Sequence, residues 1–274
     1  MKYINILLII IFFWNLIIIF KKRKNHKITE EKNIEIFNLG NSHSLVSFNY
    51  VNKNNINLGE NSQTFYYDYI ILKRYFNKIK NNGYCFLTVS YFSFASKEYW
   101  LKEDLMKYYG ILQIENFQGI SKIDCMLYKY LPLIWSMRKK MMKKNENPDF
   151  IKRIKGHKEK LKENKMLNFN LELMEKIIKK CNEKSIKVIL ITTPFTKYYN
   201  SFFEKELLEK NFYEIIEKIR NKYKLLYFDF SHDYKNFNKK EYFRDYDHLS
   251  KEGSEIFKEI LLKKLKDNNI KINF

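Results

Sequence analysis

Cysteine, proline and glycine are scarce in this sequence of 274 residues, with three, three and seven copies. Cys85, Cys125 and Cys181 are isolated along the chain and odd in number. They therefore indicate neither a disulfide framework nor a zinc site. Hydrophobic residues make up 45% of the chain and aromatic residues 17%, which is enough for a full core and argues against a disordered chain.

Sequence signatures of nucleic-acid binding are also missing, although the net charge is +20. The lysines are spread along the whole chain, as expected for solvated helix faces. We find no arginine-rich patch, zinc-finger spacing or aromatic strand pattern of RNA-binding domains, and so predict no specific nucleic-acid partner. A surface this basic would still be attracted to anionic lipids or polymers.

The N-terminal residues 3–20 carry no charged side chain. Their length is at the lower end of what a membrane-spanning helix needs, which is about 20 residues. A small-residue cleavage site is missing after them, and the basic run KKRKNHK follows directly. The pattern predicts an uncleaved, single-pass transmembrane anchor at 3–20, bound to membrane lipid, and a basic linker at 21–33.

Beyond the linker, apolar strand patterns alternate with amphipathic helix patterns. The predicted strands are 34–39, 54–59, 84–92, 186–195 and 224–231, and the predicted helices are 66–80, 170–185, 205–223 and 251–266. The stretch of about 95–165 has no strand pair and is predicted to be a mostly helical insertion. The alternation predicts a three-layer α/β/α sandwich over 34–270, with a mostly parallel, flavodoxin-like sheet of about five strands.

Two polar motifs follow predicted strands. Residues 40–44 (GNSHS) come after the first strand, and residues 243–253 (FRDYDHLSKEG) lie between the last strand and the last helix. In a parallel sheet, the ligand site lies beyond the carboxyl ends of the strands. We therefore expect the two motifs to meet there, with Ser42 as a nucleophile and His248 as the base that activates it.

An imidazole base needs a carboxylate that fixes its tautomer and stabilises its cation. Asp245, three residues before His248, can fold back across a short turn to reach Nδ1 of the imidazole. Asp247 is adjacent to His248, so its side chain is expected to point away. Asp245 is the preferred partner, with Asp247 as the alternative.

A developing oxyanion needs preorganised hydrogen-bond donors. We assign this role to the backbone N–H groups of Ser42 and Gly59, with the side chain of Asn61 or Asn41 as a further donor. The side chains predicted to contact the substrate are those of His43, Asn41 and Tyr91.

Gly40-Asn41-Ser42 and Asp245-Tyr246-Asp247-His248 resemble the first and fifth blocks of the SGNH/GDSL hydrolase superfamily. Gly59 is placed like the oxyanion glycine of the second block. Two features depart from the family pattern. Asn41 stands where the family usually has aspartate, and the third block, Gly-x-Asn-Asp, is replaced by VSYFSF (89–94), where Ser90, Tyr91 or Asn61 would have to substitute.

The form of the two matching blocks is most similar to a membrane-anchored branch of the superfamily, which includes the D-alanine transfer protein of teichoic-acid biosynthesis and acetyltransferases of exopolysaccharides. The resemblance implies a cofactor-free esterase or O-acyltransferase with an acyl-serine intermediate. Its substrate would be an acylated cell-envelope glycan or a small acyl ester, and its partner a membrane-bound acyltransferase. The resemblance also implies a domain outside the membrane, whereas the positive-inside rule places the basic flank of residues 3–20 in the cytoplasm.

Other interpretations of these residues remain open. Ser42 could cap the helix after the first strand, and Asp245 with His248 could be a structural pair that anchors the last helix. A metal site from His43, Asp245, Asp247 and His248 lacks ligand-type spacing. His157, in a lysine-rich run, is predicted to face solvent. The missing third block and Asn41 also fit a catalytically inactive binding module for an envelope polysaccharide.

Overall fold

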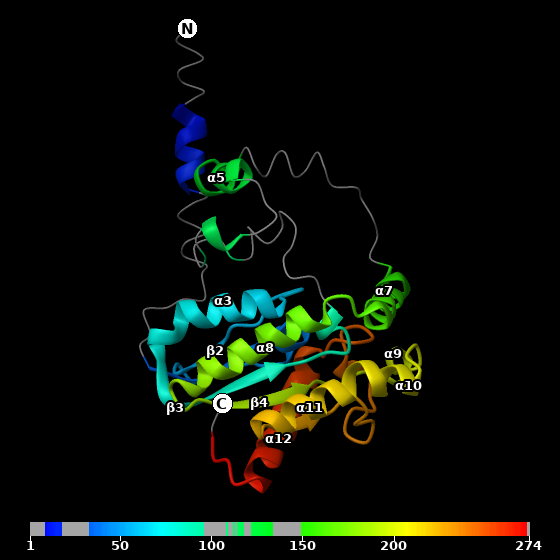
Figure 1. Cartoon of the computed structure of the whole chain (residues 1–274). Coiled ribbons are helices and arrows are strands. Elements are labelled where there is room, and N and C mark those ends of the chain that lie inside the picture. The colour runs from blue at the N-terminus through cyan, green and yellow to red at the C-terminus, as the bar shows by residue number, and fades with distance from the viewer. Residues whose placement is uncertain are drawn as a thin grey trace. The chain divides into compact units, whose positions relative to one another are not determined.

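The computed structural model of the chain describes residues 9–17, 33–95, 108, 112, 114–117, 122–133 and 149–272. The chain forms two compact units (Figure 1). One comprises Met1–Glu30 and Tyr99–Pro148, and the other comprises Glu31–Glu98 and Asp149–Phe274. The second unit holds the sheet and both polar motifs.

The sheet of this unit has five strands in the order β2-β1-β3-β4-β5, and every neighbouring pair is parallel. The strands are β1 (Ile34–Leu39), β2 (Asn55–Asn57), β3 (Ile79–Thr88), β4 (Lys187–Thr192) and β5 (Leu226–Asp229). The predicted parallel sheet of about five strands is confirmed. Because β1 and β5 are both strands of this parallel sheet, their carboxyl ends lie at the same edge, and the segments that follow them begin there.

Helices cover both faces of the sheet and complete the predicted three layers. α3 and α8 pack side by side on one face, whereas α12 lies on the other (Figure 1). On the α12 face, Phe257 and Leu261 join a buried cluster with Phe86 of β3 and Ile189 of β4. The helices of this unit are α2 (Ser42–Ser47), α3 (Phe65–Tyr75), α7 (Phe150–Glu163), α8 (Leu167–Asn182), α9 (Lys197–Asn200), α10 (Lys205–Leu208), α11 (Glu214–Tyr223) and α12 (Lys251–Asp267). A π turn (Glu209–Tyr213) joins α10 to α11, and 3₁₀ turns lie at Phe76–Lys78, Ser93–Ala95 and Lys240–Tyr242.

The predicted helix at 66–80 is too long, because β3 already begins at Ile79. Ile34 pairs with Ile79, but Ile36 pairs with Tyr84, so extra residues of β3 bulge out between these two pairs. Asn82 takes the left-handed conformation at φ 60°, and a Cβ on Gly83 would lie 2.6 Å from the carbonyl oxygen of Glu35. The Asn-Asn-Gly run is therefore a bulge inside a strand, where glycine permits a close backbone approach.

In the other unit, residues 9–17 are helical, and six of their eight large apolar side chains are 47–60% exposed. Asn15 is buried: its Nδ2 donates to the carbonyl oxygen of Ile11 at 2.8 Å, and its Oδ1 accepts from the backbone N–H of Leu133 at 3.0 Å. The unit also holds a 3₁₀ turn (Ile114–Asn116) and α5 (Lys122–Tyr130). Among the described residues, no helix combines the length and apolar character needed to span a bilayer. Residues 3–8 and 18–20 of the predicted anchor, and 21–32 of the linker, lie outside the described residues.

The described residues of the predicted insertion contain α5 and α7. α7, at the C-terminal end of that range, belongs to the unit that holds the sheet. Asp149 caps it, with Oδ1 accepting from the backbone N–H of Lys152 at 3.0 Å. α7 therefore contributes side chains to the site described next.

Candidate active site

A sharp turn after β1 presents Ser42. Gly40 has φ 126°, a conformation that favours glycine, and a Cβ there would lie 3.0 Å from the Thr88 side chain. The backbone N–H of Gly40 donates to Asp68 Oδ1 at 2.8 Å. Asn41 then caps α2, since its Oδ1 accepts from the backbone N–H of His43 at 3.0 Å. The cap is thus Asn41 and not Ser42, which is the first residue of α2 and is half-buried.

Ser42, His248 and Asp245 lie in one hydrogen-bonded row. His248 Nε2 is 2.7 Å from Ser42 Oγ. His248 Nδ1 is 2.9 Å and 3.0 Å from the two carboxylate oxygens of Asp245, and 3.4 Å from Asp247 Oδ1. With Nδ1 protonated and bonded to Asp245, Nε2 is free to accept the Ser42 proton. The structure thus brings the three predicted residues together and places Asp245, rather than Asp247, as the closer partner of His248.

The turn that carries His248 holds Asp245 in position. Asp245 Oδ1 also accepts from the backbone N–H groups of Asp247 at 3.1 Å and His248 at 2.9 Å. Burial of His248 opposes its charged form, but hydrogen bonds to Asp245 and Asp247 prevail and raise its pKa above the ordinary value of 6.5. Burial likewise opposes ionisation of Asp245, but the hydrogen bond from His248 prevails and lowers its pKa. The pair is therefore suited to accept a proton on the imidazole while the carboxylate stays ionised.

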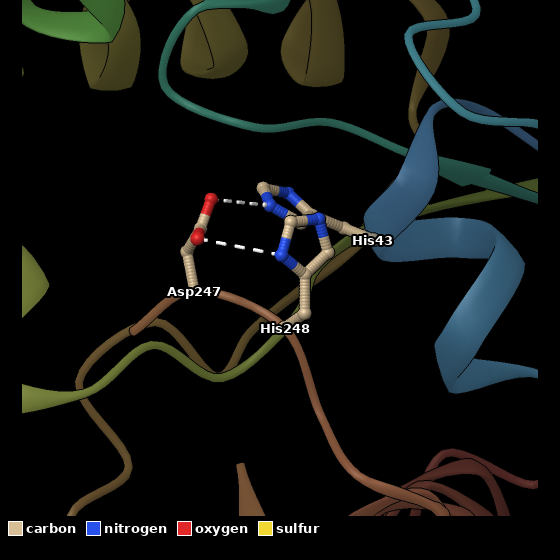
Figure 2. Close-up of side chains that lie close together, drawn as sticks. All are labelled: His43, Asp247 and His248. Carbon is tan, nitrogen blue, oxygen red and sulfur yellow. Dashed lines mark hydrogen bonds and ion pairs between the residues drawn. The ribbon is translucent and has the colours of Figure 1, made fainter. Parts of the chain in front are cut away.

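A second histidine–carboxylate pair, formed by His43 and Asp247, lies beside His248 (Figure 2). His43 Nε2 is 3.1 Å from Asp247 Oδ2, and the His43 and His248 rings are 4.7 Å apart between centroids. Hydrogen bonds from His248 and His43 outweigh the burial of Asp247 and hold its pKa far below its usual range. Burial lowers the pKa of His43, so this imidazole is neutral. Because Asp247 can only accept, Nε2 of His43 carries the proton and Nδ1 accepts from Ser90 Oγ at 2.6 Å.

Two residues of α7 complete this network, and sequence reasoning missed both. Arg153 Nη2 contacts Asp247 Oδ1 and lies 3.3 Å from Asp245 Oδ2, so one guanidinium bridges both carboxylates. His157 was expected in solvent, but its ring stacks on Phe92 with centroids 3.9 Å apart. Burial lowers the pKa of His157 to about 3. One feature of the sequence could have indicated a role for Arg153: it is one of only six arginines in a lysine-rich chain.

The predicted oxyanion donors differ in whether their N–H groups already have a hydrogen-bond acceptor. The Ser42 N–H has no hydrogen-bond acceptor within the part of the chain that the structure describes. The Gly59 N–H donates to Asn57 Oδ1 at 3.0 Å in this arrangement, and its oxyanion role stays a prediction. Asn61 is exposed, its backbone N–H donates to Glu60 Oε1 at 2.9 Å, and its side-chain role stays a prediction.

The three predicted substrate contacts are buried. His43 is 1% exposed, Tyr91 is 0% exposed and Asn41 is 5% exposed. The Tyr91 hydroxyl donates to Asn200 Oδ1 at 3.0 Å, and the Asn41 side-chain amide donates to Ser90 Oγ at 3.1 Å. Asn41 and His43 are thus held by buried hydrogen bonds next to Ser42, and Tyr91 belongs to the core. Their contact with a substrate stays a prediction.

His43, Asp247 and His248 could in principle hold a metal ion, because one ligand atom from each lies within 4.8 Å of the others. The Arg153 guanidinium, however, contacts the same Asp247 carboxylate, where it would oppose a cation. His248 Nδ1 is also engaged by Asp245. The donor set therefore suits a hydrogen-bonded network better than a metal centre.

Comparisons with known proteins complete the description. No family model matches the chain, and no curated protein matches it. Among solved structures, it is similar to a GDSL-like lipase from Bacteroides thetaiotaomicron, at 10% identity and TM-score 0.42 over 93% of this chain and 98% of that one. It is also similar to a catalytic mutant of an acetylxylan esterase from Geobacillus stearothermophilus, at 11% identity and TM-score 0.39 over 90% and 100%. A member of the lipolytic G-D-S-L family from Veillonella parvula matches at 11% identity and TM-score 0.41 over 84% and 97%.

Proposed function

We propose that this chain is an SGNH-like serine esterase or O-acyltransferase. One observation carries the proposal: Ser42 Oγ, His248 and Asp245 form a continuous hydrogen-bonded row, with 2.7 Å between Ser42 Oγ and His248 Nε2. Ser42 is half-buried, so its hydroxyl is within reach of a substrate at the edge of the sheet. A nucleophile, a base and an orienting carboxylate in this order are the parts that acyl transfer needs.

In the proposed mechanism, Ser42 Oγ attacks the ester carbonyl carbon while His248 Nε2 takes the hydroxyl proton. Asp245 stabilises the resulting imidazolium, and the Ser42 backbone N–H donates to the oxyanion. The intermediate collapses, His248 returns the proton to the leaving alcohol, and an acyl-Ser42 ester remains. His248 then takes a proton from water or from an acceptor hydroxyl, whose oxygen attacks the acyl carbon. The bond between the acyl carbon and Ser42 Oγ breaks, His248 Nε2 returns the proton to Ser42 Oγ, and an acid or a new ester is released.

The proposed substrate is an acylated glycan of the cell envelope, with small acyl esters as simpler alternatives. The support is the resemblance of the motifs at 40–42 and 245–248 to the anchored branch of the superfamily, and the uncharged segment 3–20. We propose that this segment anchors the protein in the membrane, with the domain on the outer side. A membrane-bound acyltransferase would then supply the acyl group.

The test is covalent labelling with a fluorophosphonate, which forms a stable bond with an activated serine. We expect the wild type to be labelled on the peptide that contains Ser42, and Ser42→Ala to remain unlabelled. Ser201→Ala, which removes an exposed hydroxyl that donates to the Tyr198 carbonyl, is the matched control and should label like the wild type. Equal labelling of wild type and Ser42→Ala, or no labelling of either, would contradict the proposal.

A second candidate is a catalytically inactive binding module on the same fold. It is favoured by the hydrogen bond that occupies the Gly59 N–H, which leaves the Ser42 N–H as the one open donor among the predicted backbone pair. This alternative predicts that Ser42→Ala and His248→Ala preserve cellular function. Loss of function in Ser42→Ala at normal expression would reject it.

A further inference from the structure

A cleft of about 600 Å³ lies beside the Asp245 end of the row. Asp245 and Tyr246 line it, whereas Ser42 does not. It is formed by the start of α7, by α9 and by the loop that leads to the site. Its position therefore suits a part of the substrate that is next to the reacting ester and distinct from it.

Three aromatic side chains from separate segments form an exposed platform in this cleft. Phe150, Tyr198 and Tyr246 are 38%, 43% and 38% exposed. The Tyr246 ring centroid is 4.6 Å from that of Tyr198 and 6.2 Å from that of Phe150. Clustered exposed aromatics are costly in water and commonly mark a binding surface.

The platform is tied to the candidate catalytic loop. Thr196 caps α9. Its backbone N–H and its side-chain hydroxyl both donate to the carbonyl oxygen of Tyr246, at 3.2 Å and 2.7 Å. Tyr246 is also the residue between the two carboxylates that face His248 and His43. A ligand held on the platform would therefore be positioned relative to the candidate catalytic residues.

The charge of the cleft is strongly positive. Its basic lining residues are Lys197, Lys239, Lys240 and Arg244, all exposed. Lys239 faces Glu241 at 4.0 Å, whereas Lys240 and Arg244 form no ion pair with the described residues. Asp245 is the one acidic lining residue in this cleft, and it is already engaged by His248 and Arg153. The cleft thus offers uncompensated cations beside aromatic rings.

We propose that this cleft is a subsite for an anionic glycan. The C–H faces of its sugar rings pack on Tyr198 and Tyr246, and its carboxylate or phosphate groups pair with Lys240 and Arg244. A neutral glycan would use the aromatic platform but not the cations, and a simple polyanion would use the cations but not the platform. Only an anionic glycan would use both. The inference rests on the proposed function, since it names the kind of polymer that would carry the ester to Ser42.

Binding is tested on the full-length Ser42→Ala protein, so that turnover plays no part. Calorimetry compares tetragalacturonate, which is anionic, with cellotetraose, a neutral oligosaccharide of equal length, and with an inorganic polyphosphate of matched charge. We expect tetragalacturonate to bind at least about tenfold more tightly than either of the others, a difference of about 1.4 kcal/mol. Equal binding of cellotetraose, equal binding of polyphosphate, or no binding of tetragalacturonate would overturn the subsite.

Variants locate the site. Adding Tyr198→Ala or Lys240→Gln should each weaken tetragalacturonate binding about five- to tenfold, because each removes one partner of the ligand. Lys263→Gln, which removes another exposed charge on α12 outside the cleft, is the matched control and should leave the affinity unchanged. Unchanged affinity in Tyr198→Ala and Lys240→Gln, or an equal loss in Lys263→Gln, would overturn the assignment.

The two proposals fail separately. Fluorophosphonate labelling of wild-type Ser42 without binding of tetragalacturonate to Ser42→Ala would reject the subsite and support the esterase. Binding of tetragalacturonate that depends on Tyr198 and Lys240, without labelling of Ser42, would support the subsite and reject the esterase.

Discussion

Asp247 Oδ2 lies 3.1 Å from His43 Nε2, and both side chains are withdrawn from solvent. Two residues earlier, Asp245 makes the corresponding contact with His248. Asp245 and Asp247 thus hydrogen-bond to two neighbouring imidazoles, those of His248 and His43. Only His248 contacts Ser42. The pairs are therefore expected to respond differently to mutation.

Asp245→Asn should lower kcat/KM for 4-nitrophenyl acetate by about 10²- to 10⁴-fold, because the amide no longer fixes the His248 tautomer or stabilises its cation. Asp247→Asn should mainly lower the free energy of unfolding, because it breaks buried contacts with His43 and Arg153. Steady-state kinetics and thermal unfolding separate the two effects, with exposed Asp267→Asn on α12 as the control. A larger catalytic loss in Asp247→Asn would show that Asp247 is the orienting residue.

The pH dependence of activity should follow His248, which must be neutral to accept the Ser42 proton. Since the folded-state pKa of His248 is raised above 6.5, kcat/KM should rise with pH and reach half its maximum above pH 6.5. The measurement is a pH profile of kcat/KM with a neutral ester. A midpoint below 6.5 would contradict the assignment of His248 as the base.

Arg153 should tune this profile through its charge. Its guanidinium lies on both carboxylates and reduces the negative field that His248 experiences. Arg153→Met removes this charge, so the pKa of His248 should rise further and the profile should move to higher pH. Arg153→Lys, which keeps a charge but not the guanidinium, should move the midpoint back part of the way toward that of the wild type. A purely structural role would lower activity at every pH without moving the midpoint.

Asp68 should make stability fall with rising pH. Burial raises the pKa of this carboxyl from 3.8 to about 7, although Gln63 and the Gly40 N–H donate to it. Between these two values the unfolded chain has lost the proton that the folded protein still holds, so stability declines as pH increases from about 4 to about 7.

Asp68→Asn keeps an acceptor for the Gly40 N–H and removes the titration. The stability of the variant relative to the wild type should therefore increase from pH 4 to pH 8, by up to a few kcal/mol. Chemical denaturation at several pH values measures this difference. A constant difference across the range would mean that Asp68 is ionised in the folded protein throughout.

Much of the arrangement follows from local pattern. Strand and helix periodicities placed the motifs at 40–44 and 243–253 after strands of one parallel sheet, and such a sheet brings those ends to one edge. The three-residue spacing from Asp245 to His248 allowed the turn that the structure contains. For Ser42, His248 and Asp245, the sequence alone was therefore sufficient to predict proximity.

Solvent exposure was decided by tertiary structure, because it depends on which distant segments cover a side chain. His43 and Tyr91 follow strands as Ser42 does, yet neighbouring aromatic side chains such as Phe195 cover both of them. Arg153 and His157 reach the site only because α7 packs within the unit that holds the sheet. The Asn-Asn-Gly run is a strand bulge only because β1 lies against it. Periodicity and turn chemistry are local properties that a sequence carries by itself, whereas burial, ion pairing and the exposed platform beside Asp245 arise when segments far apart in the chain meet.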